Sequence, residues 1–325
     1  MKAVLAKAYA PVEQLVLEEV AAPRPAPGAV LIAIRACGVN FFDALIVQGK
    51  YQTKPPLPFS PGGEVAGVVT EVGEGVTTLT PGTRVLAFTG YGGYAQQVAT
   101  NASNVAALPP QMDFVTAAAF PITYATSYHA LKDRGRLQPG ETLLVLGASG
   151  GVGLAAVELG KLMGARVIAC ASSEEKLAVC REHGADALIN YVASDLRERV
   201  RELTDNKGVD VVYDPVGGTY AEPAVRSLAF GGRYLVIGFA SGEIPKIPLN
   251  LLLLKVSSLV GVFWGAFAKA QPARNAANLA ELLGWCVEGR LKPHVSGTYP
   301  LERYREALEA VIGRKVMGKA VIVVD

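Results

Sequence analysis

Side chains that bind metals are scarce in this chain. Its 325 residues include only three histidines and four cysteines. The histidines lie far apart, and no two cysteines have the CxxC spacing of a zinc or redox motif. The first residues, MKAVLAKAYA, lack the long apolar run of a secretory signal. We therefore expect free thiols and a cytoplasmic protein.

The chain also lacks a strong excess of charge. Its formal net charge is +2, and no dense run of lysine or arginine occurs, so we expect no nucleic-acid or membrane partner. The longest apolar run, residues 247–267, is interrupted by Asn250, Lys255 and two serines. We expect this run to be a buried strand with its flanks rather than a membrane span.

Two hydrophobic patterns divide the chain and predict an α/β fold. Up to about residue 110, short Val/Ile/Ala runs are separated by Pro-Gly and Gly-Gly pairs, which is typical of a β-rich barrel or sandwich. Residues 113–133 are expected to form two helices joined at Pro121. From residue 141 strands and helices alternate, which predicts a parallel, doubly wound sheet.

A glycine-rich turn follows the first strand of the alternating part. In LLVLGASGGVGLAAVELG, glycines 147, 150 and 153 lie between a predicted strand and a predicted helix. The start of a helix offers unpaired amides and the positive end of the helix dipole to an anion. Glycines there let the backbone approach a pyrophosphate and let the helix pack on the strand. This context favours dinucleotide binding over a turn without a ligand.

The end of the next strand indicates which dinucleotide is bound. An NAD site usually has an acid there for the ribose 2′-hydroxyl, whereas RVIACASSEEK has Ala171 or Ser172. Lys176, one helical turn later, suits a 2′-phosphate, although it could also be a surface lysine. The nearby Glu174 and Glu175 lie in the first turn of a helix, where the dipole stabilises acids without a ligand. The pattern favours NADPH over NADH.

Segments along the whole chain resemble the medium-chain dehydrogenase/reductase superfamily, and within it the zeta-crystallin-like quinone oxidoreductases. They include GVNFFDALIVQGKY, PGGEVAGVVTEVG, GASGGVG, DVVYDPVGG and GRYLVIGFASG. The resemblance implies a GroES-like catalytic domain made of residues 1–122 and 267–325. It also implies a Rossmann NADPH-binding domain over residues 123–266, and a homodimer or homotetramer.

The positions of the relatives' zinc ligands carry other residues in this chain. Zinc-dependent relatives have Gly-His-Glu where this chain has Gly62-Gly63-Glu64, and their first metal cysteine falls at Asn40. The four-cysteine structural zinc loop is also missing. We therefore predict no bound metal. Without zinc to polarise an oxygen, the suited acceptors are quinones and α,β-unsaturated carbonyls, which delocalise the negative charge they receive.

Three polar residues are candidates for catalysis. Asn40 could bind a substrate oxygen or the nicotinamide ribose, or could be a turn asparagine. Tyr51 matches a tyrosine of quinone reductases and could donate a proton or a hydrogen bond, or could be a loop aromatic. Thr126 falls where the family has a nicotinamide contact, or could be a helix-interior threonine. A structural role is expected for Glu64, Asp43, Asp214 and His129, the last having no identifiable partner in the sequence.

The resemblance also implies a set of cofactor contacts from distant segments. They are Asn40, Thr126, Gly150, Gly151, Val152, Ser172, Lys176, Tyr191, Gly238, Phe239, Ala240, Phe263 and Arg314. Phe263 departs from relatives that have a polar residue there. Two alternatives stay open: an enoyl-thioester reductase that shares Tyr51, and an NADPH-binding protein with a structural or sensory role.

Overall fold

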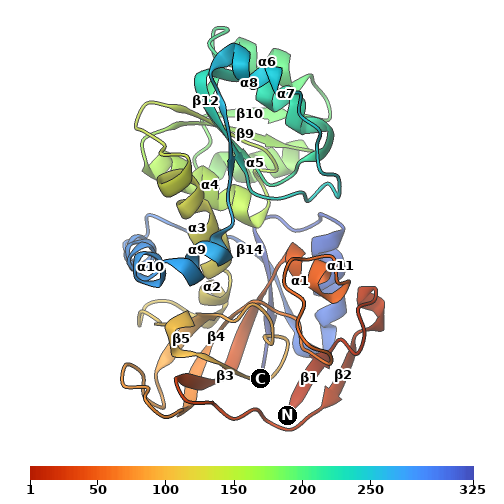
Figure 1. The fold of residues 1–325 in the computed structure, drawn as a ribbon, viewed down its shortest axis with the longest axis vertical. Helices are drawn as coiled ribbons and strands as arrows, with labels where there is room; N and C mark the ends of the chain where they lie inside the picture. The colour runs from red at the N-terminus through yellow and green to blue at the C-terminus, as the bar shows by residue number, and fades with distance from the viewer. The chain divides into compact units, whose positions relative to one another are not determined.

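The chain forms two compact units, drawn in Figure 1. A computed structural model describes all residues, 1–325. The first unit comprises Met1–Ile122 and Pro293–Asp325, and the second comprises Thr123–Lys292. The domain boundary that the sequence predicts after residue 122 coincides with this division. Residues 267–292, predicted to belong to the first domain, lie in the second unit instead. No helix is long and apolar enough to cross a membrane.

Helix α10 (Pro272–Val287) explains the difference at residues 267–292. Its Trp285 packs edge to face on Tyr128, with ring centroids 5.4 Å apart. Its Glu281 accepts hydrogen bonds from Tyr128 at 2.5 Å and from Lys132 at 2.8 Å. These contacts join residues about 150 positions apart, so no local pattern could assign this helix to the second unit.

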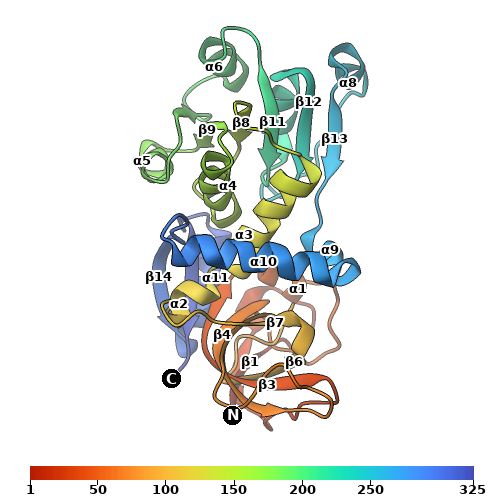
Figure 2. The same cartoon turned by 90° about the vertical axis from the view of Figure 1, so that its left-hand side faces the viewer.

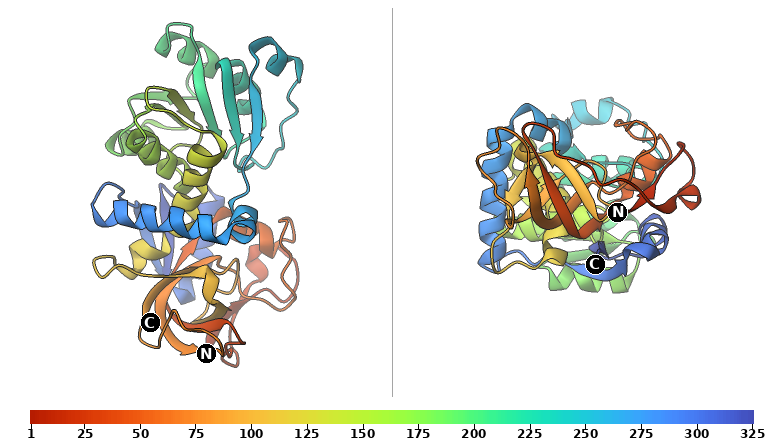
Figure 3. Two further views of the ribbon diagram at one scale, coloured as in Figure 1. Left: turned by 60° about the vertical axis from the view of Figure 1, so that its left-hand side comes forward. Right: turned by 90° about the horizontal axis from the view of Figure 1, so that it is seen from below.

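The first unit is β-rich, and both chain ends lie in it (Figure 3). A seven-stranded sheet has the order β14-β15-β3-β4-β5-β7, with β6 paired to β3, and β1 pairs with β2 in a separate ribbon. The strands are β1 (Lys2–Leu5), β2 (Val16–Glu19), β3 (Ala29–Val39), β4 (Glu64–Val72), β5 (Arg84–Phe88), β6 (Gln97–Asn101), β7 (Val105–Ala107), β14 (Val295–Pro300) and β15 (Lys319–Val323). The helices are α1 (Phe41–Val47), α2 (Phe114–Ala118) and α11 (Tyr304–Ile312), with short turns at η1 (Val12–Gln14), η2 (Ala102–Asn104) and η5 (Leu301–Arg303).

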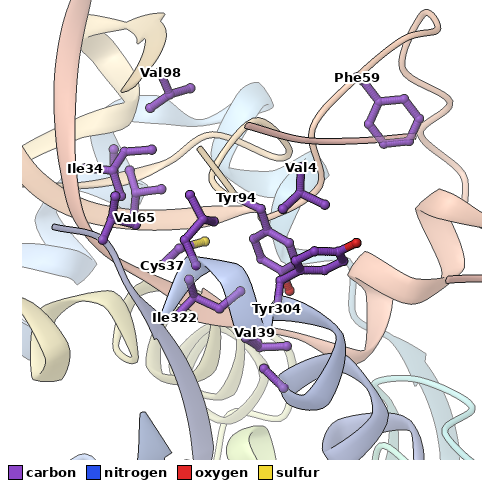
Figure 4. Close-up of a cluster of buried hydrophobic side chains, with 14 of the residues drawn as sticks. Val4, Ile34, Cys37, Val39, Phe59, Val65, Tyr94, Val98, Tyr304 and Ile322 are labelled. Atoms are coloured by element: carbon purple, nitrogen blue, oxygen red, sulfur yellow. The ribbon is translucent and has the colours of Figure 1, made fainter. Parts of the chain in front are cut away.

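The core of the first unit gathers alternate side chains of several strands (Figure 4). Ile34 on β3, Val65 on β4 and Ile322 on β15 are at most 2% exposed. Strand alternation explains this arrangement, because every second side chain of a strand points to the same face of the sheet. Tyr94 and Cys37 are also fully buried there.

The second unit has a six-stranded parallel sheet in the order β10-β9-β8-β11-β12-β13. Numbered from β8, this is the 3-2-1-4-5-6 order of a doubly wound dinucleotide-binding fold. The strands are β8 (Thr142–Val145), β9 (Arg166–Ala171), β10 (Ala187–Asn190), β11 (Val209–Asp214), β12 (Leu228–Val236) and β13 (Ser258–Gly261). The predicted fold class is confirmed.

Helices pack against this sheet: α4 contacts β8 and β9, and α5 contacts β9 and β10. Figure 2 shows α4 and α5 beside β8 and β9. The helices besides α10 are α3 (Pro121–Tyr128), the π-helical η3 (His129–Arg134), α4 (Gly151–Leu162), α5 (Glu174–Glu182), α6 (Leu196–Leu203), η4 (Gly218–Tyr220), α7 (Ala221–Arg226), α8 (Asn250–Lys255) and α9 (Trp264–Ala270). The predicted helix junction at Pro121 is confirmed, because α2 ends at Ala118 and α3 begins at Pro121.

The long apolar run differs from its prediction as a buried strand. Residues 247–267 contain the helix α8, the edge strand β13 and the start of α9. Several of its apolar side chains are exposed: Leu249 (73%), Leu253 (79%), Leu254 (73%) and Val256 (64%). The prediction failed because hydrophobicity alone does not distinguish a core from an exposed apolar surface.

Candidate functional site

The glycine-rich turn of the second unit has the geometry of an anion-binding helix start. Strand β8 ends at Val145, and α4 begins at Gly151 with Gly150 as its N-cap and no side-chain capping bond. A Cβ on Gly153 would lie 2.3 Å from the carbonyl oxygen of Gly147, so this close approach of helix and turn requires glycine. The amides of the first turn of α4 therefore keep the capacity to bind a phosphate.

All but one of the predicted cofactor contacts of the second unit follow the carboxyl ends of its parallel strands. Gly150, Gly151 and Val152 follow β8, Ser172 and Lys176 follow β9, Tyr191 follows β10, the segment 238–240 follows β12, and Phe263 follows β13. Because these strands are parallel, their carboxyl ends share one edge of the sheet. Ligands of open α/β sheets bind at this edge. The exception is Thr126, which lies in α3. The other two predicted contacts, Asn40 and Arg314, belong to the first unit.

Ser172 and Lys176 form a basic, hydroxyl-bearing site at the end of β9. The Lys176 ammonium donates to the Ser172 hydroxyl at 3.2 Å. Ser173 caps α5 by accepting from the Lys176 amide. The nearby acid Glu174 accepts a hydrogen bond from the Asn190 side chain at 3.0 Å. An interaction with the protein thus accounts for this carboxylate.

An aromatic pair flanks the same edge. The rings of Tyr191 and Tyr220 lie 4.2 Å apart at an angle of 37°. Sequence reasoning missed Tyr220, which follows the Gly217-Gly218 turn in DPVGGTY. Phe239 and Phe263, both predicted cofactor contacts, are 37% and 50% exposed. These rings make this edge of the sheet suited to flat, partly apolar groups.

Two predicted structural residues of the second unit have defined partners. Asp214 accepts from the amides of Val216 (2.6 Å) and Gly217 (2.9 Å) and from the Tyr234 hydroxyl, so it shapes the turn after β11. His129 has a partner that the sequence reasoning did not identify: Asp133 lies 2.8 Å from its Nδ1 atom. The i,i+4 spacing on a helix could have revealed this pair.

Thr126 lies half-buried in α3, beside a residue that contacts the phosphate-binding turn. The hydroxyl of Ser127 donates to the Val152 carbonyl at 2.8 Å and lies 2.8 Å from the Tyr213 hydroxyl. Helix α3 is thereby tied to the start of α4. Sequence reasoning did not single out Ser127, the residue that makes this connection.

The first unit buries an ion pair at Glu64. The Lys319 ammonium on β15 donates to the Glu64 carboxylate at 2.7 Å, to the Asn40 amide oxygen at 2.7 Å and to the Val39 carbonyl at 2.9 Å. The other Glu64 oxygen accepts from the Ile122 amide at 2.8 Å. Glu64 is fully buried and Lys319 is 5% exposed. The predicted structural role of Glu64 thus has a specific partner, 255 residues away in the sequence.

Asp43 is a second buried acid beside this pair. It accepts from the Asn40 amide at 2.8 Å and from the Tyr94 hydroxyl at 3.2 Å, while its Oδ1 atom has no hydrogen-bond partner. Burial raises the pKa of Asp43 to about 7, against the opposing effects of the Asn40 amide and Lys319. A protonated carboxyl suits this site, because a buried charge with an unsatisfied oxygen is costly.

Replacing Asp43 with asparagine is expected to flatten the pH dependence of stability. The unfolded carboxyl has a pKa of about 3.9, so between that value and about 7 the folded state keeps a proton that the unfolded state has lost. The free energy of unfolding of the wild type therefore falls as pH rises over this window, by up to about 4 kcal/mol, and levels off above it. An amide cannot ionise and should not show this fall. Equal slopes of urea midpoint against pH in both proteins would contradict the protonated state.

An aromatic ring occupies the space beside Gly63. A Cβ on Gly63 would lie 2.4 Å from the Cζ atom of Phe42. The Phe42 ring stacks on Tyr51, with centroids 5.4 Å apart and an angle of 28°. Burial, followed by the charge of Asp43, raises the pKa of Tyr51, so its phenol keeps its proton at neutral pH. The unit thus has an aromatic pair beside Gly63, the position at which the resemblance implied a zinc-ligating histidine.

The side chains at the relatives' metal position do not fit a zinc ion. Asn40 and Gly63 supply no thiolate or imidazole, and Glu64 already pairs with Lys319. No group of three or more His, Cys, Asp or Glu residues could hold a metal elsewhere in the chain. Burial raises the pKa of the Cys37 thiol well above its ordinary value, which disfavours a metal-binding thiolate.

Two family descriptions match the two parts of the chain. Residues 26–110 match the alcohol dehydrogenase GroES-like domain, and residues 151–281 match zinc-binding dehydrogenases. Both matches fall within the units described above.

Curated relatives and solved structures resemble nearly the whole chain. The quinone oxidoreductase-like protein 2 homolog of Nematostella vectensis is 42% identical over 296 residues, which cover 90% of this chain and 81% of the relative. Quinone oxidoreductase-like protein 2 of Bos taurus is 41% identical over 310 residues, 95% of this chain and 88% of the relative. The crystal structure of Escherichia coli quinone oxidoreductase complexed with NADPH is 29% identical, with a TM-score of 0.94, and covers 99% of this chain and 100% of its own.

Proposed function

Because the chain belongs to the quinone oxidoreductases of the medium-chain dehydrogenase/reductase superfamily, we propose that it transfers a hydride from NADPH to a quinone or an α,β-unsaturated carbonyl, without zinc. The resemblance inferred from the sequence is confirmed, and the chain is an oxidoreductase of this superfamily. One observation carries the finer proposal. The second unit has a turn of the dinucleotide-binding type. In the first unit, Phe42 fills the space beside Gly63, so no zinc-binding side chain fits there.

The proposal that the cofactor is NADPH rather than NADH rests on residues of the second unit. NADPH supplies the hydride, and the protein orients it and excludes water. We propose that the amides at Gly150, Gly151 and Val152 bind the pyrophosphate at the start of α4, where no side chain caps the helix. Ser172 and Lys176 present a hydroxyl and a cation for the 2′-phosphate, with no acid at the end of β9. The NADPH in the E. coli neighbour supports the same assignment.

The proposed acceptor follows from the chemistry of the first unit. Without a Lewis acid, the developing negative charge on the acceptor must be delocalised by the acceptor itself, as in quinones and enones. Tyr51 keeps its proton at neutral pH and can donate a hydrogen bond or a proton to the developing enolate or hydroquinone oxygen. We propose Tyr51, Asn40 and Thr126 as the polar residues of the reaction site, and Arg314 as a further cofactor contact.

Steady-state NADPH oxidation tests this function. Wild type is expected to reduce 1,2- and 1,4-quinones or enones, with chelator-treated enzyme equally active, and to prefer them to an enoyl-CoA. Tyr51→Phe should lower kcat/KM for the preferred acceptor by about a hundredfold, the typical size of a lost general acid. The control Tyr91→Phe, at a 38% exposed tyrosine of the same unit, should match wild type.

Three results would contradict the proposal in different ways. A preference for enoyl-CoA by orders of magnitude would favour the enoyl-thioester reductase. NADPH binding without turnover of any acceptor would favour a structural or sensory protein. Activity lost to chelation and restored by zinc would overturn zinc independence.

We also propose a homodimer or homotetramer in the cytoplasm. Strand β13 lies at the edge of the six-stranded sheet and pairs only with β12, and exposed apolar side chains at Leu253, Leu254 and Val256 precede it. An unpaired edge beside exposed apolar residues favours association. All four cysteines are free, in keeping with a reducing compartment. A monomer mass by light scattering at micromolar concentration would contradict the assembly.

A further inference from the structure

The π-helical segment η3 of the second unit brings two distant side chains onto one face. His129 begins this segment and Arg134 ends it. A π-turn closes its hydrogen bonds between residues five apart, so the first and last side chains point in similar directions. In an α-helix, residues five apart point about 140° away from each other. The π-turn therefore allows His129 and Arg134 to reach the same neighbouring segment.

That neighbouring segment connects β13 to α9, and Figure 2 shows the connection. Arg134 donates from its Nε atom to the carbonyl of Gly261, the last residue of β13, at 3.1 Å. The ring of His129 stacks on Phe267 of α9, with centroids 3.9 Å apart and an angle of 16°. Phe263 lies between these two contacts in the chain. The segment is thus held to η3 on both sides of Phe263.

Asp133 keeps the His129 ring in place. Its carboxylate lies 2.8 Å from the Nδ1 atom of His129 and accepts hydrogen bonds from Arg274 and Asn278 of α10. The side chain of Asp133 is 4% exposed, and His129 is buried. A buried carboxylate with three partners leaves this ring little freedom to turn. The stack of His129 on Phe267 is therefore a rigid contact.

Phe263 is an exposed residue on this fixed segment. Half of its surface is accessible, whereas the adjacent Trp264 is 7% exposed. The Trp264 indole donates to the Asn275 side chain of α10 at 2.8 Å, so α9 is anchored at its first residue as well. An aromatic side chain left exposed on a fixed backbone is suited to packing against a flat ligand.

The order of the strands indicates which half of the cofactor reaches Phe263. The proposed 2′-phosphate site follows β9, and the proposed pyrophosphate site follows β8. A dinucleotide lies across the carboxyl ends of a sheet of this order. Its nicotinamide half should therefore extend toward the other half of the sheet, β11, β12 and β13. Phe263 follows β13.

We infer that His129 and Arg134 are positioning residues, which hold Phe263 in place to bind the nicotinamide half of NADPH. This inference rests on the proposed function and deepens it, because it gives a role to residues outside the predicted cofactor contacts. A side chain on a fixed backbone loses little freedom when a ligand packs against it. The reduced nicotinamide ring is flat and uncharged, so an aromatic contact suits it.

Titration calorimetry of the full chain with NADPH and with adenosine 2′,5′-bisphosphate, which lacks the nicotinamide, tests the inference. Phe263→Ala is expected to raise the Kd for NADPH about tenfold, the size of one lost aromatic contact, and the Kd for the bisphosphate less than about twofold. His129→Leu/Arg134→Met is expected to raise the Kd for NADPH at least about threefold, because the freed segment must be ordered on binding. The bisphosphate should bind this variant as it binds wild type. The variant should fold, since Asp133 keeps its partners on α10.

The combination of all three substitutions separates positioning from a general structural role. If both residues act through Phe263, the triple variant should bind NADPH no more weakly than Phe263→Ala, because the losses are then one. Losses that multiply, an equal loss of bisphosphate affinity, or wild-type affinity for NADPH in Phe263→Ala or in the double variant would each overturn the inference. The control Arg201→Met removes another exposed arginine, whose Nε atom donates to Asn206, and should leave both Kd values unchanged.

This measurement needs no acceptor. Failure to reduce any quinone or enone would refute the proposed reaction, while the inference would still stand or fall on the Kd values for the two ligands. Failure of the wild type to bind NADPH would refute both.

Discussion

A Gly63→His substitution is expected to destabilise the first unit by about 3 kcal/mol and to create no zinc site. The Cβ atom alone would lie 2.4 Å from the Phe42 ring and 3.3 Å from the Gly90 carbonyl, before an imidazole is added. Phe42 in turn stacks on Tyr51, so the ring cannot move without breaking that contact. Even with the histidine present, Asn40 and a Glu64 that pairs with Lys319 would leave the ion short of ligands.

The double variant Gly63→His/Phe42→Ala tests this explanation. Removing the ring makes room for the histidine. The double variant should therefore lose about 1–2 kcal/mol less free energy of unfolding than the losses of the two single variants added together. Urea unfolding of all three variants measures this coupling. The control Gly297→Ala adds a Cβ that would meet only Tyr299, at 3.6 Å or more, and should cost little. Additive losses would show that Phe42 does not fill the place of the side chain at residue 63.

A Lys176→Glu substitution is expected to weaken NADPH binding by about a hundredfold and NADH binding by less than about threefold. The ammonium beside Ser172 is lost, and a carboxylate is placed near the expected 2′-phosphate. NADH has a hydroxyl in place of this phosphate and should not be repelled. The ratio of the two dissociation constants, measured in the same buffer, reports the effect.

A charge reversal elsewhere in the second unit controls for the overall change in net charge. Lys207 is exposed and precedes β11, at the opposite edge of the sheet from Ser172. Lys207→Glu should change the affinity for both cofactors by less than about twofold, since exposed charges are screened over a Debye length of about 8 Å. Equal losses for NADPH and NADH in Lys176→Glu would refute the 2′-phosphate role.

Local sequence patterns determined much of the second unit. A strand, a glycine-rich turn and a helix follow one another within about twenty residues, so local geometry alone predicts a phosphate-binding turn. The absence of an acid after β9 is equally local. Several predicted contacts then lie at one edge of the sheet because all six strands are parallel. The pairing of Tyr191 with Tyr220 was missed, because it joins segments that follow different strands.

The sequence by itself determined that residues 62–64 carry no zinc-binding histidine, that a dinucleotide turn follows β8, and that the chain alternates strand and helix from residue 141. Only the tertiary structure determined which side chains occupy the position at which the resemblance implied a metal ligand. Phe42 fills the space beside Gly63, and Lys319 neutralises Glu64 from a strand 255 residues away. The reason is physical: spacing along the chain predicts contacts within a helix or between a strand and its next turn. The partner of a buried charge is chosen by the pairing of β15 with β3 and of β3 with β4, which no local pattern contains.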